Sequence, residues 1–560
     1  MSARTSGLSA NGLGAAILLA LSTPALAQVA SAPLGQLDPW GVGWLSKTEG
    51  ALPTGIWSNT TSAALAPLYA GLQPQQLSPA GRAALRRVAL SSVKGPADGA
   101  ALIPERLRLI EQLGESERSI DLRKRFPDTA WGKQYERAAS GYELVLNRTD
   151  AACARVSGKR GDDPDWMPVR ALCFALASDF NAASLAAEHI PPDADGRSDA
   201  WLLAAIETME APAKNKPEGR YATPLDAAVS IAAKLSAPAG ALATTPADVA
   251  TAIVQHPAAT LEQKRAALRP ALDGGRLKPA DVLAVLTAKD ETPTAKPAAG
   301  RAATPRTDFL ALALNAAASS DAKPDAKATV FAAALKSAET PSDFRLAAYA
   351  LLDPIKALPK NDATAPNAET FARVALVAGD TKAAQDWRKY MDEKADPWAA
   401  ARIDLMLSYT AASPGKPGEI LDRLVAAIPP LPEASKEATA AKAATPATRQ
   451  LDLRRIENTR VFFLYAGTDR DLSPDQRALL AAQKAAGRGV SDAALARIGS
   501  AIEAGANGEA ALASIALLGP DVSALSFAGL ADILTELRRV GLEKDADAIA
   551  LEALQVWKAL

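Results

Sequence analysis

Apolar residues recur at helical spacing along most of the chain. The segment Leu525–Val540, LSFAGLADILTELRRV, places them every three or four positions, and Gly541 then suits a left-handed helix stop. The helical pattern resumes from Glu543 to Leu560. Runs of Val, Ile and Thr long enough for strands are almost missing. The pattern predicts an all-α chain, and its C-terminal part reads most clearly as a helical hairpin.

Helix starts are marked by a capping hydroxyl followed by proline, which is favoured at the first helical position. Such pairs occur at Ser78-Pro79, Thr223-Pro224, Thr245-Pro246, Thr340-Pro341 and Ser473-Pro474. The predicted helices have about three turns, and helices this short need neighbours to be stable in water. Because the connections are brief, we expect consecutive helices to lie antiparallel. The predicted fold is an irregular α-solenoid of antiparallel helical hairpins.

A tryptophan-rich segment, residues 28–77, precedes the helical region. Its sequences DPWGVGW and GALPTGIW contain glycine and proline, which break helices, so we expect an extended N-terminal arm. The arm carries Trp40, Trp44 and Trp57. Large aromatic side chains bury much apolar area, so these residues either dock on the first helices as a cap or form a binding platform for a glycan or a partner.

Two stretches rich in Ala, Pro, Thr and Lys interrupt the helical pattern. Residues 287–306 and 431–447 lack an apolar stripe and are predicted to be exposed linkers. They divide the helical region into three predicted blocks, which are residues 78–286, 307–430 and 448–560.

The first 27 residues have the form of a secretory signal peptide. Arg4 precedes a short apolar run, Leu13–Leu21, and Ala25-Leu26-Ala27 forms a small-residue cleavage site before Gln28. No segment of the chain approaches the roughly 20 apolar residues of a membrane-spanning helix. We therefore expect a soluble, exported protein with no integral membrane segment. The alanine-rich signal is typical of bacteria and favours the periplasm over secretion.

The amino-acid composition argues against some kinds of binding partner and favours helices. The chain has 62 basic and 63 acidic residues and a net charge of −1, which argues against nucleic acid or an anionic membrane as the main partner. Alanine is the commonest residue; it is the best helix former, and its small side chain lets helices approach closely.

The two cysteines are predicted to form a structural disulfide. Cys153 lies near the end of one predicted helix and Cys173 near the start of the next, with the polar turn SGKRGDDPD between them. Comparable distances from the turn let the two Cα atoms reach disulfide separation, and an oxidising compartment favours the bond. Two buried thiols are the alternative. The C-x-x-C spacing of redox pairs is absent, and a zinc site would need two more ligands.

Candidate chemistry is sparse. The only histidines, His189 and His256, lack metal-binding or triad spacing and are interpreted as helix-end residues that interact with the helix dipole. No nucleophile elbow, phosphate loop or dinucleotide fingerprint occurs after residue 27. We therefore predict no catalytic residues, no metal site, no cofactor and no enzymatic activity.

The hairpins resemble the tetratricopeptide-repeat superfamily, including its irregular Sel1-like members. That family places a small residue at the turn and another five positions later, where two helices cross. The matching pairs here are Gly541 with Ala546, Gly379 with Ala384, Gly505 with Ala510, and Ser178 with Ala183. The chain as a whole also resembles uncharacterised exported alanine-rich helical proteins of Gram-negative bacteria.

Stacked hairpins would present an extended concave surface suited to another protein or a peptide. We therefore expect a non-enzymatic binding or scaffolding protein that supports a cell-envelope assembly or a surface appendage. One alternative is a peptidoglycan- or glycan-associated protein that binds through Trp40, Trp44 and Trp57. A second alternative is an unrecognised periplasmic hydrolase.

The signal-peptide hypothesis predicts that the mature chain begins at Gln28. N-terminal sequencing of the protein recovered from a periplasmic fraction checks this. A chain that keeps its first 27 residues in that fraction would contradict the prediction.

Overall fold

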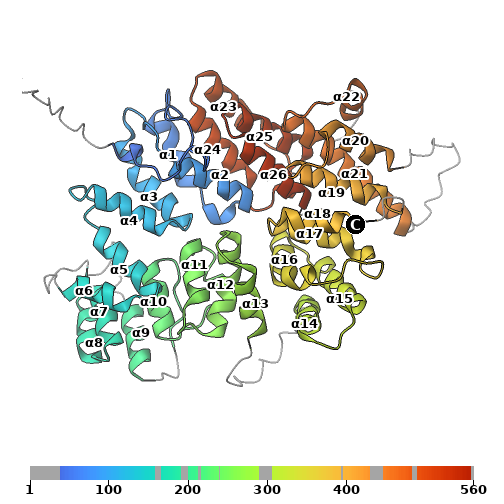
Figure 1. Cartoon of the computed structure of the whole chain (residues 1–560). Helices are drawn as coiled ribbons and strands as arrows, with labels where there is room; N and C mark the ends of the chain where they lie inside the picture. Colours follow the sequence, from blue (N-terminus) through green and yellow to red (C-terminus); the bar gives the residue numbers. More distant parts are fainter. Residues whose placement is uncertain are drawn as a thin grey trace, which may run out of the picture. The chain divides into compact units, whose positions relative to one another are not determined.

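The computed structural model describes residues 38–157, 166–190, 200–211, 216–238, 240–288, 305–391, 395–428, 446–481 and 488–555. The chain from Asp38 to Leu560 groups into one compact unit. Its described elements are α-helices and short 3-10 helices, with one isolated bridge between Arg488 and Leu525 (Figure 1). The all-α prediction is confirmed. The predicted cleavage site at Ala27 and Gln28 lies outside the described residues.

The helices follow one another with short connections. The first run comprises α1 (Ser62–Gly71), α2 (Pro79–Leu90), α3 (Ile103–Gln112), α4 (Ser116–Arg125), α5 (Tyr135–Val145), α6 (Thr149–Ser157), α7 (Met167–Leu176), α8 (Phe180–Glu188), α9 (Ala200–Glu210), α10 (Pro224–Ala232), α11 (Ala247–Gln255), α12 (Leu261–Asp273) and α13 (Pro279–Thr287). The second comprises α14 (Pro305–Ala318), α15 (Pro324–Lys336), α16 (Pro341–Lys356), α17 (Ala368–Val377), α18 (Thr381–Arg388), α19 (Pro397–Ser408) and α20 (Pro417–Ala426). The third comprises α21 (Pro446–Gly467), α22 (Pro474–Ala481), α23 (Asp492–Glu503), α24 (Asn507–Leu518), α25 (Phe527–Arg539) and α26 (Glu543–Gln555).

Short 3-10 helices occupy some of the connections. They are η1 (Pro39–Gly41), η2 (Pro74–Gln76), η3 (Gly99–Leu102), η5 (Ala365–Asn367) and η6 (Val522–Ala524). Helices α14 and α21 each begin two residues before the predicted blocks at 307 and 448. Most of the predicted linkers 287–306 and 431–447 lies outside the described residues.

Capping hydroxyls start the helices at most of the predicted positions. The hydroxyl of Ser78 accepts the Gly81 N–H, and Thr223 and Thr340 cap α10 and α16 in the same way. Ser473 exchanges hydrogen bonds with the residue three positions later, which is a complete capping box. Thr245 differs from the prediction. Its hydroxyl donates to the Tyr221 carbonyl at 2.8 Å, and α11 begins after Pro246 without a side-chain cap.

The helix pairs expected from the small-residue pattern share one type of turn. Gly541, Gly379, Gly505 and Ser178 have φ of 86°, 77°, 72° and 64°. After α25 the Leu542 N–H donates to Leu537 O at 2.9 Å and the Gly541 N–H to Arg538 O at 3.0 Å, which is the Schellman arrangement. The partner alanine five positions on is fully buried in each case: Ala546, Ala384, Ala510 and Ala183. The flanking helices pack directly on each other (Figure 1).

Two turns of the same kind lack a glycine–alanine signature. Gly114 has φ of 77° and is followed by the fully buried Ser119, while Asn147 has φ of 60° and is followed by the fully buried Ala152. The chain around Asn147, which the sequence pattern assigned to one helix ending near Cys153, therefore forms two helices, α5 and α6. Turn residues therefore recur at short intervals near both ends of the described chain. Gly114, Asn147 and Ser178 form one series, and Asp469, Gly505 and Gly541, each 36 residues apart, form the other.

The predicted arm is not extended throughout. Residues Ser62–Gly71 form α1, which begins where the Thr61 hydroxyl accepts the Ala64 N–H. The run AALAPLYA contains enough apolar and helix-forming residues to pack, and α1 contacts α3 and α24. The proline at position 67 is tolerated, although it removes one helical hydrogen bond.

Segments from the two ends of the described chain lie side by side (Figure 1). Helix α2 packs on α24 and α26. The Ser78 N–H donates to Gly519 O at 2.7 Å, and the Ala80 N–H donates to the Glu552 carboxylate at 2.8 Å. Arg87 forms an ion pair with Asp545. The contact joins residues that are more than 400 positions apart in the sequence.

The last described turn of α26 lies among buried arginines. Arg460, Arg402 and Arg373 donate to the carbonyls of Ala553, Leu554 and Gln555, each at 3.1 Å. The three arginines come from α21, α19 and α17 and expose at most 3% of their surface. Each arginine thus gives a charged donor to a backbone carbonyl of α26, and such charge-assisted hydrogen bonds are stronger than neutral ones.

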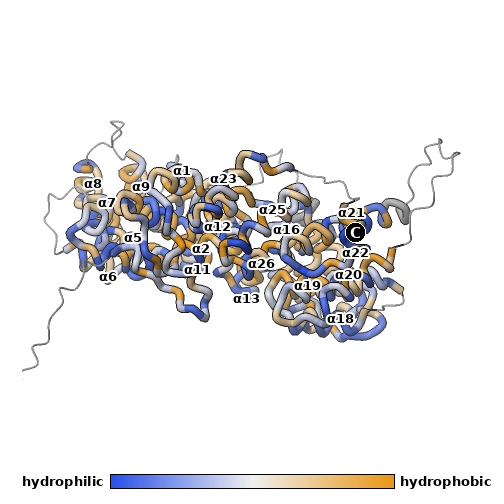
Figure 2. The backbone as a smooth tube through the Cα atoms, turned by 90° about the horizontal axis from the view of Figure 1, so that it is seen from above, coloured by the Kyte–Doolittle hydropathy of each residue, from blue (hydrophilic) through white to orange (hydrophobic). Residues whose placement is uncertain are grey.

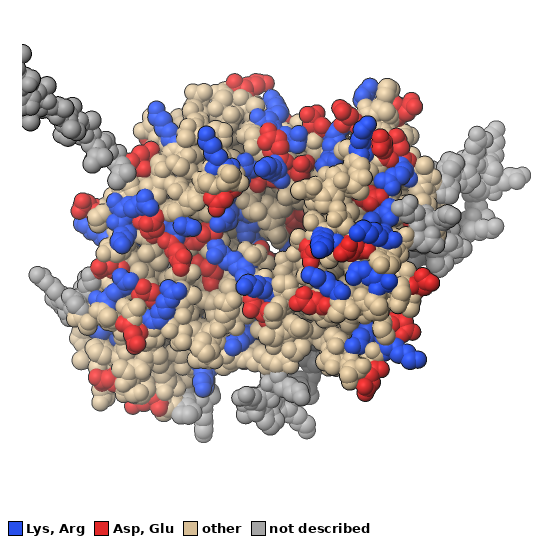
Figure 3. All heavy atoms as spheres, viewed as in Figure 1, with Lys and Arg blue, Asp and Glu red and all other residues tan. Residues whose placement is uncertain are grey.

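The described surface is mixed in character. Figure 2 shows hydrophobic and hydrophilic residues interspersed along the helices, and Figure 3 shows acidic and basic side chains distributed together over one face. None of the described helices is both long enough and apolar enough to cross a lipid bilayer.

Ala546 is buried in α26 whereas Ala548 is exposed, so substitutions at these two positions should differ strongly in their effect on stability. Ala546→Leu adds volume at a fully buried site and should lower the free energy of unfolding by about 1–3 kcal/mol. Ala548→Leu, on the exposed side of the same helix, should change it by less than about 0.5 kcal/mol. Urea unfolding followed by circular dichroism measures both. Equal losses of unfolding free energy in the two variants would contradict the tight packing of Ala546.

Candidate functional site

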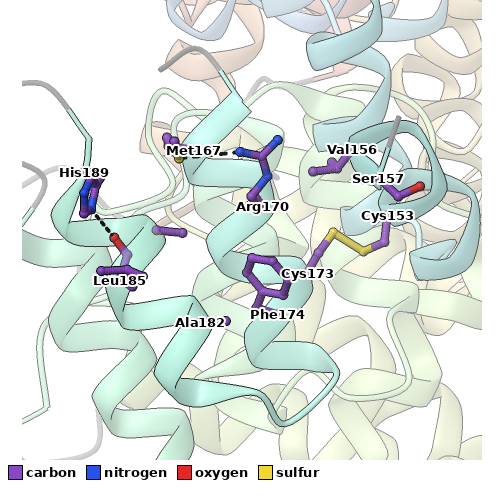
Figure 4. Close-up of a pocket in the computed structure, with 11 residues that line it drawn as sticks. Cys153, Val156, Ser157, Met167, Arg170, Cys173, Phe174, Ala182, Leu185 and His189 are labelled. Atoms are coloured by element: carbon purple, nitrogen blue, oxygen red, sulfur yellow. Dashed lines mark hydrogen bonds between the residues drawn. A yellow bond between two sulfur atoms is a disulfide. The ribbon is translucent and has the colours of Figure 1, made fainter. Parts of the chain in front are cut away.

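Two hollows on the first run of helices are the candidate sites. The first, here called the disulfide groove, has a volume of about 710 Å³ and lies between α6, α7 and α8 (Figure 4). Its lining residues are Cys153, Val156, Ser157, Met167, Arg170, Cys173, Phe174, Ala182, Leu185, Ala186 and His189. A volume of this size is within the range of small-ligand and side-chain pockets.

The structure brings the two cysteines together in the wall of this groove. Cys153 on α6 and Cys173 on α7 have Cα atoms 5.6 Å apart and sulfur atoms at disulfide distance, 2.04 Å. Both side chains are half-buried. The pair ties α6 to α7 and closes one side of the groove (Figure 4).

The groove wall is mainly apolar and partly open to solvent. Leu185 on α8 exposes 58% of its surface. The polar groups that line the groove include Arg170, whose Nη1 lies 3.8 Å from Met167 Sδ. A partner that covers an exposed apolar side chain beside an apolar hollow removes apolar surface from water, which favours binding.

Both histidines lie at helix ends, but their roles differ. His189 follows α8, and its Nδ1 lies 2.8 Å from Leu185 O, consistent with the expected helix-end position. His256 follows α11, and its Nδ1 accepts the Ala258 N–H at 3.1 Å. Burial lowers the pKa of His256, which favours its neutral form relative to a histidine in water.

The second hollow, here called the arginine groove, has a volume of about 510 Å³. It lies between α3, α4, α5, the start of α10 and the segment before α11. Its lining residues are Arg108, Glu111, Gln112, Ser116, Ile120, Arg123, Gln134, Arg137, Ala138, Gly141, Tyr142, Pro168, Ala222, Thr223, Pro224, Leu225, Thr244 and Pro246. The sequence pattern did not indicate this site, since its residues come from six separate segments, one of them the start of α7 at Pro168.

A buried carboxylate holds Ser116, one of the lining residues of the arginine groove. Asp248, at the start of α11, accepts the Ser116 N–H at 2.9 Å and so holds the start of α4. Burial raises the pKa of Asp248 and that of Tyr142, so the neutral forms of both groups are favoured relative to water.

The tryptophans of the predicted arm lie against the first helices. Trp40 and Trp57 expose 2% and 1% of their surface and pack edge to face, while Trp44 is half-buried. Indole Nε1 of Trp40 donates to Gly99 O at 3.0 Å, and that of Trp44 donates to the Asp121 carboxylate at 2.9 Å. A sugar-stacking platform needs exposed ring faces, which Trp40 and Trp57 do not present in this structure.

A buried arginine fixes this segment to the helices. Arg106 on α3 donates to Pro39 O at 2.8 Å, to Val42 O at 2.9 Å and to Ala89 O at 3.1 Å. Its guanidinium carbon lies 5.4 Å from the centre of the Trp40 ring. A charged donor that satisfies carbonyls of both the segment and α2 contributes more than a neutral hydrogen bond would.

In the parts of the chain that the structure describes, no three His, Cys, Asp or Glu side chains gather closely enough to hold a metal ion. Comparisons with family models, with curated proteins and with solved structures find no match to this chain. Function is therefore inferred from the chain's own surfaces.

The cysteine pair predicts a measurable contribution to stability. The linked residues are 20 positions apart, and closing such a loop stabilises the fold by about 3 kcal/mol in the chain-entropy model. The double variant Cys153→Ser/Cys173→Ser should therefore unfold at lower urea concentration while keeping its helical spectrum. A thiol assay of the wild-type protein under denaturing, non-reducing conditions should find no free thiol, and two free thiols would contradict the bond.

Proposed function

We propose that this protein is a non-enzymatic, exported scaffold whose helix pairs stack as an irregular α-solenoid and hold a partner protein. The partner belongs to a cell-envelope assembly or surface appendage in the periplasm. The disulfide groove is the proposed contact site, and it receives apolar side chains of the partner.

The observation that carries this proposal is the exposure of Leu185 beside an apolar hollow. Leu185 exposes 58% of its surface, and the neighbouring lining includes Val156, Met167 and Phe174. Covering about 100 Å² of such surface contributes roughly 2.5 kcal/mol. The cysteine pair holds two of the three helices, so the groove is preformed and binding costs little conformational entropy.

The recurrence of one turn type supports the solenoid. Turns with a residue in the left-handed conformation and a buried Ala or Ser five positions later occur after α3, α5, α7, α17, α23 and α25. In such arrays each unit contacts mainly its neighbours, and the surfaces left exposed between units bind other proteins.

The proposal predicts a position-specific contact. A photo-crosslinking amino acid placed at Leu185 should yield a discrete crosslinked partner in the native periplasm, because this side chain lies at the groove. The same amino acid at Leu312 on α14 is the matched control, since Leu312 exposes 56% of its surface but lies away from the groove. Crosslinked species are identified by mass spectrometry.

A second variant separates specific docking from chance capture. With the crosslinker at Ala182, another lining residue, Leu185→Glu should abolish the crosslinked species, because a carboxylate in the groove opposes apolar contact. Identical products from positions 185 and 312, or products that survive Leu185→Glu, would refute the proposed site.

A further inference from the structure

We infer that the pair Cys153 and Cys173 makes the disulfide groove sensitive to redox state: the oxidised pair holds α6 against α7, and its reduction by a dithiol frees α6 and weakens partner binding. This inference rests on the proposed function, because it concerns the regulation of the same site. It goes beyond that function, since a groove whose shape did not depend on the pair would hold its partner in both redox states.

Both cysteines are open to attack from the groove. Their side chains are half-buried, and both line the hollow, which is partly open to solvent. Figure 4 shows the two sulfur atoms at the side of the groove, where α6 meets α7. Exposed disulfides exchange more readily than deeply buried ones, because the attacking thiolate has to reach a sulfur atom. A thiolate can therefore reach this pair while the helices stay folded.

Helix α6 depends on the pair for its position against α7. It packs more extensively on α5 than on α7. The guanidinium of Arg155 on α6 donates to the Glu143 carboxylate on α5 at 2.7 and 3.1 Å, and Ala152, five positions after the turn residue Asn147, is fully buried. Because the noncovalent contact of α6 with α7 is the smaller one, the S–S bond supplies much of what holds these two helices together.

Helix α7 keeps its other neighbours without the pair. It packs on α8 and α9, and its residues Val169, Ala171 and Leu172 are fully buried. The turn at Ser178 joins α7 to α8, and the small residue five positions later, Ala183, is also fully buried. Reduction therefore leaves α7 and α8 packed on each other and frees mainly α6.

A shift of α6 would change the surface that a partner contacts. Helix α6 contributes Cys153, Val156 and Ser157 to the lining, while α7 and α8 contribute most of the rest. The oxidised pair fixes the two Cα atoms 5.6 Å apart, so the groove is already formed before a partner arrives. In the reduced protein α6 has to be ordered against α7 when the partner binds, and this loss of conformational entropy lowers the affinity.

The reduction is a thiol–disulfide exchange. One thiolate of the dithiol attacks a sulfur atom of the pair, the S–S bond breaks, and a mixed disulfide forms while the other cysteine leaves as a thiolate. The second thiol of the dithiol, as its thiolate, then attacks the mixed disulfide and releases the first cysteine. The protein gains two electrons and two protons, and the dithiol loses the same number and becomes a disulfide.

The first test uses the purified full-length protein without a partner. Dithiothreitol should reduce the pair in the folded protein at a rate within about tenfold of the rate in urea, because the sulfur atoms are accessible. Alkylation of the released thiols followed by mass spectrometry measures both rates. After reduction, the backbone amides of α6 should exchange hydrogen about tenfold faster, while those of α25, which does not line the groove, should not change.

A pair of variants on α8 tests whether attack comes through the groove. Ala182 lines the groove, so Ala182→Phe should fill part of it and slow the reduction by dithiothreitol. Asn181→Phe is the matched control, because Asn181 is exposed on the same helix and does not line the groove. Equal reduction rates in the two variants would contradict attack from this side.

The second test measures partner binding. With the photo-crosslinking amino acid at Leu185, the double variant Cys153→Ser/Cys173→Ser should yield about tenfold less crosslinked partner than the protein with both cysteines. Circular dichroism should show the same helix content in both proteins, and hydrogen exchange should show that the double variant differs from the oxidised wild type mainly in α6. These two controls separate a local change at the groove from a general loss of stability.

The possible outcomes distinguish this inference from the proposed function. A pair that resists dithiothreitol until urea unfolds the protein, exchange in α6 that does not respond to reduction, or equal crosslinking with and without the cysteines would each overturn the redox inference, and the last result would leave the proposed function intact. If neither protein captures a partner, the proposed function fails, and the reduction and exchange rates still decide whether the groove responds to redox state.

Discussion

The structure depends on how closely neighbouring helices approach each other. At Ala183, Ala384, Ala510 and Ala546 the side chain is fully buried, so only a small side chain fits there between the helices. In each case a left-handed residue follows the end of the preceding helix by two positions and turns the chain back within a short connection. Larger side chains would separate the helices and leave voids that the rest of the sequence could not fill.

Charged groups in the interior add specificity to this packing. The guanidinium of Arg402 contacts Glu369 at 2.7 Å and Glu457 at 3.3 Å and also donates to the end of α26. A buried ion pair yields little net stability, because two charges leave water. If only one partner of the pair is removed, however, the other charge is left buried without a partner, which is strongly destabilising. Another placement of α26 among α17, α19 and α21 would leave these buried guanidinium groups without their carbonyl partners, which disfavours that placement.

Local features were predictable from the sequence, and distant contacts were not. Caps such as Ser78, turns such as Gly541 and the approach of Cys153 to Cys173 depend on residues within about 25 positions, so spacing alone indicated them. The turn at Asn147 was missed because only glycine and serine were considered at the left-handed position. Helix α1 was missed because proline and glycine around it suggested an extended arm. The arginine groove and the contact of α2 with α26 could not be predicted, because periodicity says which face of a helix is apolar but not which helix covers it.

The hydrogen bond between Ala80 and Glu552 joins residues 472 positions apart. Helix pairs such as α25 and α26 can form as soon as their own residues are available, but the contact of α2 with α24 and α26 also needs the C-terminal helices. Long sequence separation slows folding, because the loop entropy is lost before the contact is gained. We therefore expect this contact to form after the local helix pairs, and until it forms the side of α2 that α24 and α26 cover is open to solvent and prone to aggregation.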